Sequence, residues 1–202
     1  MKRTIKTSLL WLSVTLAPLA GGSIGGALLS SCSDEPDAEH FYTYIGQMMS
    51  EYLKQNPQFS QYAAIVERAG LMKLLSAYGT YTCFAPTNDA IDRYLHQRGL
   101  SDISQLTDAD CDTIARTHLV KNSFSTAAMG DGVLATANMN RRYLEISHGT
   151  DEYDRSVVFL NDDAHIIYEL QDDSVDNGIM QPVNQVLESS NRMVVDLMKL
   201  NP

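Results

Sequence analysis

The stretch that decides the fold is YTCFAPTNDAI at residues 81–91, where a short strand is predicted to run directly into a helix. Residues 80–84 alternate in polarity and are rich in β-branched and aromatic side chains, as half-buried strands are. We expect Pro86 to end the pairing of this strand, because proline has no backbone N–H. Thr87 or Asn88 then offers a side-chain oxygen to the free N–H groups of the new helix. Such a corner indicates a fold and no particular chemistry.

This stretch resembles the first signature box of the fasciclin domain, in which a strand ends in Thr-x-Phe-Ala-Pro-Thr-Asn-x-Ala. Residues 177–187, NGIMQPVNQVL, resemble the closing box of that family, and residues 114–120, IARTHLV, resemble its central segment. The three boxes follow the order of the family between residues 59 and 187. The signature residues that carry the resemblance are Thr82, Phe84, Pro86, Thr87, Asn88, His118, Asn177, Gly178, Val186 and Leu187.

The resemblance implies an α+β fold, a wedge-shaped β-sandwich core flanked by N-terminal helices. The residue pattern agrees with this class, because helical periodicity precedes short β segments along the chain. Two positions depart from the family: Thr117 stands where a tyrosine is usual, and Gln181 stands where the closing box has a histidine. The pattern predicts helices at 42–55, from 59–60 to 70, 71–76, 88–97 and 108–118, and strands at 143–146, 157–160, 166–170 and 180–187. Asn161-Asp162-Asp163 predicts a hairpin turn.

The first 31 residues have the pattern of a lipoprotein signal peptide. A basic start and an apolar core at 8–17 are followed by Leu29-Ser30-Ser31, directly before Cys32. This resembles the lipobox of bacterial lipoproteins, in which a diacylglycerol is attached to the cysteine. The alternative is an uncleaved membrane helix, but Pro18 and two glycine pairs leave only a short apolar span. We therefore predict membrane attachment through lipid on Cys32.

Residues 32–41 are polar and contain proline, which predicts a flexible tether. Acidic residues directly after Cys32 resemble the signal that sends lipoproteins to the outer face of the bacterial outer membrane. The alternative is an ordinary solvated linker in the periplasm. We expect a surface-exposed, lipid-anchored protein with one fasciclin-like domain at 42–190.

The charge of the whole sequence bears on its partners, and its last residues bear on the number of domains. It has 25 acidic and 15 basic residues among 202, a formal net charge of -10. Nucleic acid is therefore an unfavourable partner, since its phosphates would be repelled. The tail at 191–202 contains DLMKLNP, which echoes EYLKQNP at 51–57. This echo fits the start of a second repeat that the chain does not complete.

The sequence shows no group of residues with the spacing of a catalytic site. We expect no enzyme activity, no bound metal and no cofactor. Its histidines lack zinc-site spacing, and it has no glycine-rich phosphate loop or nucleophile elbow. His118 is the best candidate for a special histidine, and its alternative is a core imidazole hydrogen-bonded across the fold. Cys83 and Cys111 can form a disulfide outside the cell, or they can be two buried free thiols, which we favour.

The predicted function is that of a non-enzymatic surface module that binds proteins or carbohydrate, resembling fasciclin domains in adhesion. Its predicted contact region lies around the strand–helix corner and includes Asn88, Asp89, His118 and Asn177. The alternative is an accessory lipoprotein of an outer-membrane glycan-uptake complex, with tyrosines as sugar platforms. A hydrolase that uses His118 with a carboxylate is a third, weaker hypothesis. The candidate platforms are Tyr42, Tyr44, Tyr78, Tyr81, Tyr143 and Tyr153.

Overall fold

The computed structural model describes residues 46–188. The predicted signal peptide at 1–31, the lipid site Cys32, the tether at 32–41 and the tail at 191–202 lie outside the described residues. These features stay predictions. The predicted helix at 42–55 lies partly within the described range, where it begins at Met49.

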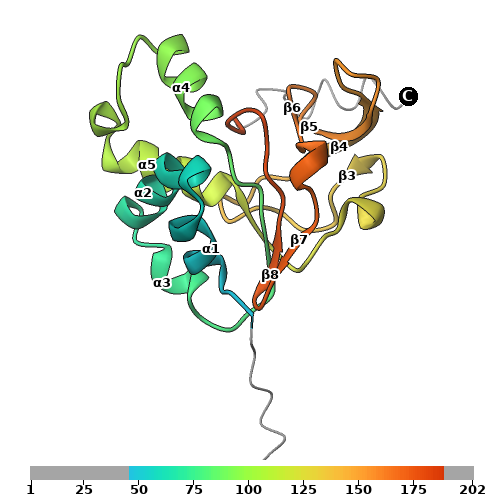
Figure 1. Cartoon of the computed structure of the whole chain (residues 1–202), viewed down its shortest axis with the longest axis horizontal. Helices are drawn as coiled ribbons and strands as arrows, with labels where there is room; N and C mark the ends of the chain where they lie inside the picture. Colours follow the sequence, from blue (N-terminus) through green and yellow to red (C-terminus); the bar gives the residue numbers. More distant parts are fainter. Residues whose placement is uncertain (1–45, 189–202) are drawn as a thin grey trace, which may run out of the picture. The chain divides into compact units, whose positions relative to one another are not determined.

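Five α-helices gather on one side of the described domain (Figure 1). Each buries an apolar face, and the large side chains Phe59, Tyr62 and Leu75 are almost completely enclosed. Glycine ends α2 and α4, since Gly70 and Gly99 adopt the left-handed conformation that other residues disfavour. The α-helices are α1 (Met49–Gln55), α2 (Ser60–Arg68), α3 (Met72–Leu75), α4 (Asn88–Gln97) and α5 (Asp108–Thr117). Four 3-10 turns accompany them: η2 (Pro57–Phe59), η3 (Ile103–Gln105), η4 (Thr126–Ala128) and η5 (Tyr168–Leu170).

Two four-stranded sheets complete the described domain, with strand orders β2-β1-β8-β7 and β3-β4-β5-β6. The first sheet contains β1 (Tyr81–Cys83), β2 (Leu119–Lys121), β7 (Asp173–Val175) and β8 (Gly178–Met180). The second contains β3 (Gly132–Val133), β4 (Glu145–Thr150), β5 (Ser156–Leu160) and β6 (Ala164–His165). All pairings are antiparallel except that of β1 with β8, which is parallel and aligns Tyr81 with Gly178. The α+β class is confirmed.

The first sheet separates two apolar cores. Cys83 and Ala85 point into the core beneath the helices, whereas Phe84 between them points into the core between the two sheets. Leu119 and Val120 divide in the same way. This alternation follows from the two-residue repeat of extended chain, so a one-residue slip would exchange the two sets of side chains.

Pro86 does not end the pairing of its strand, contrary to the prediction. The pairing continues into residues 177–188, which we call the closing segment: the Val183 N–H donates to the Ala85 carbonyl at 2.9 Å, and Pro86 itself bridges Val183 in parallel. From residue 82 to residue 86, the backbone nitrogens of even-numbered positions point toward β2. The Phe84 N–H, for example, donates to the His118 carbonyl. The residues before His118 belong to helix α5, not to β2, so the missing proline N–H leaves no strand partner unsatisfied.

The structure tests the predicted cap of α4, the predicted hairpin turn and two of the predicted strands. Thr87 caps α4 by accepting from the Ala90 N–H, and Thr107 and Asp110 form a capping box on α5. The hairpin turn at Asn161 is confirmed by the pairing of β5 with β6. The predicted strand at 166–170 is wrong, because most of it forms η5. The predicted strand at 180–187 is wrong in extent, since β8 ends at Met180.

Asn177 joins three distant segments at the start of β8. Its Oδ1 accepts from the Met49 N–H at 2.9 Å, and its Nδ2 donates to the carbonyls of Leu75 at 2.7 Å and Ala77 at 3.1 Å. The next residue, Gly178, has a φ of 143°, and any Cβ there would collide with the Tyr81 carbonyl. This Asn-Gly pair therefore fixes β8 beside β1 and holds two helices to it.

We expect Asn177→Ala to lower the free energy of unfolding by about 3 kcal/mol, since three buried backbone groups each lose a partner worth roughly 1 kcal/mol. Urea unfolding at neutral pH measures this change. The matched control is Gln97→Ala on the exposed side of α4, which we expect to alter stability by less than about 0.5 kcal/mol. Equal effects of the two substitutions would contradict this role of Asn177.

Candidate functional site

The strand–helix corner is built from α4 and the polar residues at its start. Asn88 faces α2: its Oδ1 accepts from the Gln61 N–H at 3.1 Å and its Nδ2 donates to the Pro57 carbonyl at 2.9 Å. Asn88 therefore caps α2 from outside, and Ser60 is the first residue of that helix. Asp89 is exposed in the first turn of α4, where the helix dipole favours its negative charge.

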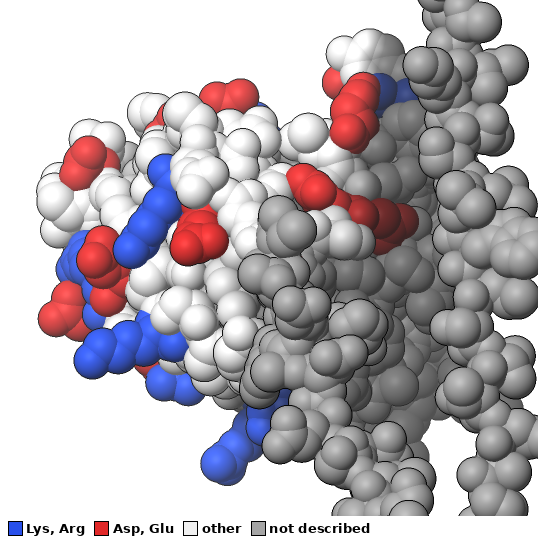
Figure 2. Space-filling model, turned by 60° about the horizontal axis from the view of Figure 1, so that its bottom comes forward, with Lys and Arg blue, Asp and Glu red and all other residues white. Residues whose placement is uncertain are grey.

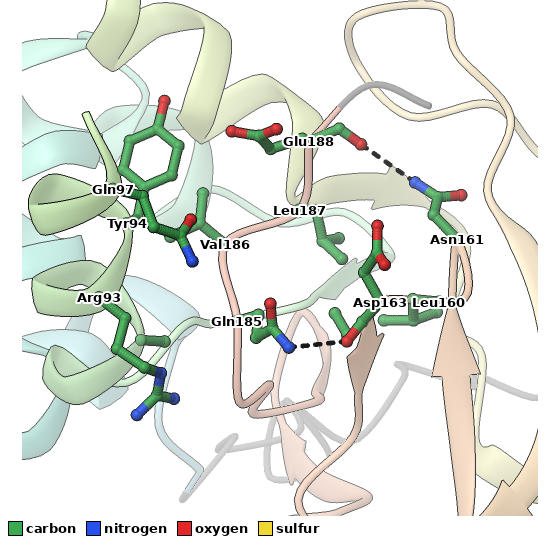
Figure 3. A pocket seen from close by; sticks show the side chains of 12 residues that line it. Arg93, Tyr94, Gln97, Leu160, Asn161, Asp163, Gln185, Val186, Leu187 and Glu188 are labelled. Atoms are coloured by element: carbon green, nitrogen blue, oxygen red, sulfur yellow. Dashed lines mark hydrogen bonds between the residues drawn. The ribbon is translucent and has the colours of Figure 1, made fainter. Parts of the chain in front are cut away.

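A groove runs along α4, with residues 185–188 of the closing segment and the β5–β6 turn forming its other walls (Figure 3). We call this the α4 groove. Its cavity has a volume of about 270 Å³, below the roughly 300 Å³ at which sites for whole small molecules begin. It is lined by Ala90, Arg93, Tyr94, Gln97, Leu160, Asn161, Asp163, Ala164, Gln185, Val186, Leu187 and Glu188.

The polar rim of the α4 groove is held by its own hydrogen bonds. The Gln185 Nε2 donates to the Asp163 carbonyl at 2.8 Å, and the Asn161 Nδ2 donates to the Glu188 carbonyl at 3.2 Å (Figure 3). These bonds fix the closing segment to the β5–β6 turn. The rim therefore presents amide and carboxylate groups on a supported backbone.

A second, more open hollow of about 420 Å³ adjoins the corner. Thr87, Asn88 and Asp89 line it together with Arg93, which borders the α4 groove as well. The Arg93 Nη2 donates to the Asn184 carbonyl at 2.5 Å, so its guanidinium is anchored between the two hollows. Arg93 is the residue that joins them.

His118 is completely buried between α5 and the closing segment. Its Nε2 lies 2.9 Å from the Leu187 backbone nitrogen, whose N–H can only donate. The proton is therefore on Nδ1, which donates to the Ile114 carbonyl at 2.8 Å. Burial lowers the pKa of the imidazole to about 4, so the ring is neutral at pH 7. Neither ring nitrogen is left for a substrate.

The four predicted contact residues do not share one surface. Asn177 lies buried at the start of β8, and His118 lies buried in mid-domain, so neither presents side-chain surface to a partner. Asn88 and Asp89 lie at the other end of the parallel pair, beyond Pro86. His118 instead positions the groove wall, because it holds the N–H of Leu187. The predicted contact region therefore reduces to Asn88, Asp89 and their surroundings.

The structure adds groove residues that the sequence did not single out. Arg93 and Gln97 lie on the exposed side of α4, and Gln185 lies in the closing box, so helical spacing could have placed only the first two together. The sequence indicates Asn161 and Asp163 only as residues of a turn. Their approach to α4 depends on the fold of the intervening chain.

Cys83 and Cys111 are both free and buried, which confirms the favoured interpretation. Burial raises the pKa of the Cys83 thiol to about 12, and its Sγ lies 3.9 Å from the Tyr62 hydroxyl. A protonated, enclosed thiol is a poor nucleophile. These cysteines act as small apolar core residues.

Surface charge on the described residues is mixed. Acidic and basic side chains are interspersed over the described part of the face in Figure 2. Residues 46–188 contain no cluster of ligands that could hold a metal ion. Within the same residues, no helix is both long enough and apolar enough to cross a membrane.

The stability of the protein should fall as pH drops from 6.5 toward 4, because of His118. The folded pKa lies below the ordinary 6.5, so only the unfolded chain takes up a proton across this window. We expect a loss of about 3 kcal/mol, measured by urea unfolding at several pH values. His118→Gln should flatten this dependence.

Two observations would contradict this assignment. One is an equal pH dependence in His118→Gln and the unmodified protein. The other is an NMR titration in which the His118 ring protonates near pH 6.5 in the folded state.

Comparison with known proteins bears on the whole domain. The family described as "Fasciclin domain" matches residues 57–189. A solved structure of a FAS1 domain pair from the insect cell adhesion molecule Fasciclin I is similar, with a TM-score of 0.56 and 17% sequence identity. The match covers 70% of this chain and 51% of that one, so this chain spans about half of the insect structure. No curated protein matches the sequence.

The family match spans most of the chain and includes the corner, the buried histidine and the whole closing segment. The structural similarity agrees with the arrangement of helices and sheets. The chain belongs to the fasciclin domain family.

Proposed function

We propose that this protein is a non-enzymatic interaction module, attached through lipid on Cys32 to the outer face of a bacterial outer membrane. The family membership supports an adhesion or interaction role. The lipobox at the start of the chain supports the attachment. Its partners are then surface proteins or glycans, and its net charge of -10 disfavours nucleic acid.

One observation carries the proposal: polar groups in the interior are buried and hydrogen-bonded, whereas polar groups at the rim of the α4 groove reach the surface. His118, the strongest candidate for catalysis, is enclosed and has both ring nitrogens engaged. Within residues 46–188, every buried side-chain nitrogen and oxygen has a hydrogen-bond partner. Exposed polar groups, in contrast, line the α4 groove and the adjoining hollow.

The size of the α4 groove supports contact rather than enclosure of a substrate. About 270 Å³ accommodates one side chain or one sugar ring of a larger partner. Arg93 adds a cation at the edge of both hollows, and the exposed carboxylate of Asp89 lines the second hollow. Charges of both signs at a rim favour orientation of a partner.

Lipid attachment at Cys32 is tested on the full chain in its host bacterium. We expect mass spectrometry of the mature protein to find a diacylglycerol on an N-terminal Cys32, and Cys32→Ala to appear in soluble fractions. Digestion of intact cells with protease should remove the unmodified protein. A mature chain that lacks the acyl group would contradict the attachment, and protection from protease would contradict surface exposure.

Contact through the α4 groove is tested by reversing one charge. We expect Arg93→Glu on the full chain to reduce attachment of cells to a surface coated with their own envelope proteins and polysaccharides at least threefold. Lys73→Glu is the matched control, because it makes the same charge change on the exposed side of α3. Thermal melting should verify that both variants fold. Unchanged attachment in Arg93→Glu would contradict this surface.

A further inference from the structure

A second surface feature lies on the outer side of the second sheet, around Arg155. Its guanidinium carbon lies 4.7 Å from the ring centre of Tyr153 and 5.4 Å from that of Tyr168. Both rings are exposed, Tyr153 to 68% and Tyr168 to 45%. Such cation–π contacts orient aromatic side chains that would otherwise move freely in water. We call these three residues the Tyr–Arg–Tyr platform.

The centre of the platform is held by a nearly buried carboxylate. Asp151 Oδ1 accepts from the N–H groups of Tyr153 at 2.9 Å and Arg155 at 3.0 Å, while Oδ2 accepts from the Arg155 Nε at 2.7 Å. The hydrogen bond from the Arg155 side chain lowers the pKa of Asp151 to about 2. Glu169 pairs with the other side of the guanidinium. Arg155 is therefore fixed, and the two rings rest on a fixed support.

Two further aromatic rings lie on the second sheet. The Phe159 ring covers the space where a Cβ of Gly149 would be. His165, paired with Phe159 across β5 and β6, lies edge-on to it with ring centres 5.5 Å apart. Both rings lie on the side of the sheet opposite Leu160, because side chains alternate along strands. Arg155 lies in the turn directly before β5, so the platform stands at the end of this sheet.

Charge around the platform is negative. The cation of Arg155 is offset by Asp151 and Glu169, and the exposed residues Glu152 and Asp154 add two further carboxylates beside Tyr153. An anionic ligand would be repelled at this place. Carboxylates accept hydrogen bonds strongly, so a ligand rich in hydroxyl groups is complementary.

The area is too small for a protein partner. A tyrosine presents at most about 250 Å², and these two are only partly exposed, whereas a stable protein interface needs roughly 800 Å² on each side. A pyranose ring has one apolar face of C–H groups and a rim of hydroxyl groups. It can cover one tyrosine ring and reach a neighbouring carboxylate.

We propose that the Tyr–Arg–Tyr platform binds a neutral polysaccharide by stacking successive sugar rings on Tyr153 and Tyr168. Because Arg155 holds both rings beforehand, little side-chain freedom is lost on binding. Hydroxyl groups of the sugar donate to Glu169 and Asp154 at the edge. This surface is separate from the α4 groove, and its sugar binding does not depend on a partner in that groove.

Tyr153 was among the tyrosines that the sequence indicated as sugar platforms, whereas Tyr168 was not. Of the other candidates, Tyr78 and Tyr143 are exposed and Tyr81 is half-buried. Within residues 46–188, neither Tyr143 nor Tyr81 has a cation–π contact. Tyr42 and Tyr44 lie outside the described residues. The support from Arg155 is what distinguishes Tyr153 and Tyr168.

The test is affinity electrophoresis of the full-length protein in gels that contain neutral polysaccharides, namely soluble β-glucan, xyloglucan, mannan and amylopectin. We expect at least one of these to retard the protein, while anionic polygalacturonate does not. Tyr153→Ala and Tyr168→Ala should each weaken binding, raising the apparent Kd obtained from the retardation by up to about tenfold. Tyr153→Phe keeps the ring and should bind as the unmodified protein does.

The matched control is Tyr143→Ala, which removes a ring of similar exposure outside the platform and should leave retardation unchanged. Thermal melting should show that all variants fold. The proposal is overturned if none of the neutral polysaccharides retards the protein, or if Tyr153→Ala and Tyr143→Ala bind equally. Arg93→Glu should retain sugar binding, so a failure of the platform and a failure of the α4 groove are told apart.

Discussion

The parallel pairing of β1 with β8 is the constraint on which the rest of the domain depends. It joins residues that are almost a hundred positions apart, with Tyr81 opposite Gly178. Because side chains alternate along both strands, this one register sends Cys83 and Met180 toward the helices and Phe84 toward the second sheet. Both cores are therefore assembled only when the closing segment has reached β1.

Polar side chains enforce that register together with the apolar packing. Asn177 satisfies backbone groups of α1 and of the end of α3, and His118 accepts from Leu187 at the far end of the closing segment. Burying such groups is costly unless each finds its partner, so a shifted register would leave several unsatisfied. Gln181 meets the same requirement: its amide accepts from the Asp172 N–H and donates to the Asp172 carboxylate.

A domain closed in this way carries its recognition on the surface. The α4 groove lies where α4, the closing segment and the β5–β6 turn meet, and the Tyr–Arg–Tyr platform lies on the β4–β5 hairpin and η5. Each uses side chains from elements that the cores position rigidly. Loops on a rigid scaffold can vary without disturbing the interior, and binding residues are often found on such loops.

The sequence alone determined the local structure at the strand–helix corner, at the start of α5 and at the β5–β6 turn. The cap at Thr87, the capping box of Thr107 and Asp110, the turn at Asn161 and the family itself depend on residues close together in the chain. Tertiary structure alone decided that Pro86 continues the pairing, that Asn88 caps another helix, and that His118 and Asn177 are buried. It also brought Arg93 to the closing segment and Tyr168 to Arg155. The physical reason is range: caps and turns are satisfied within a few residues, whereas burial and side-chain partners depend on which distant segments the two cores bring together.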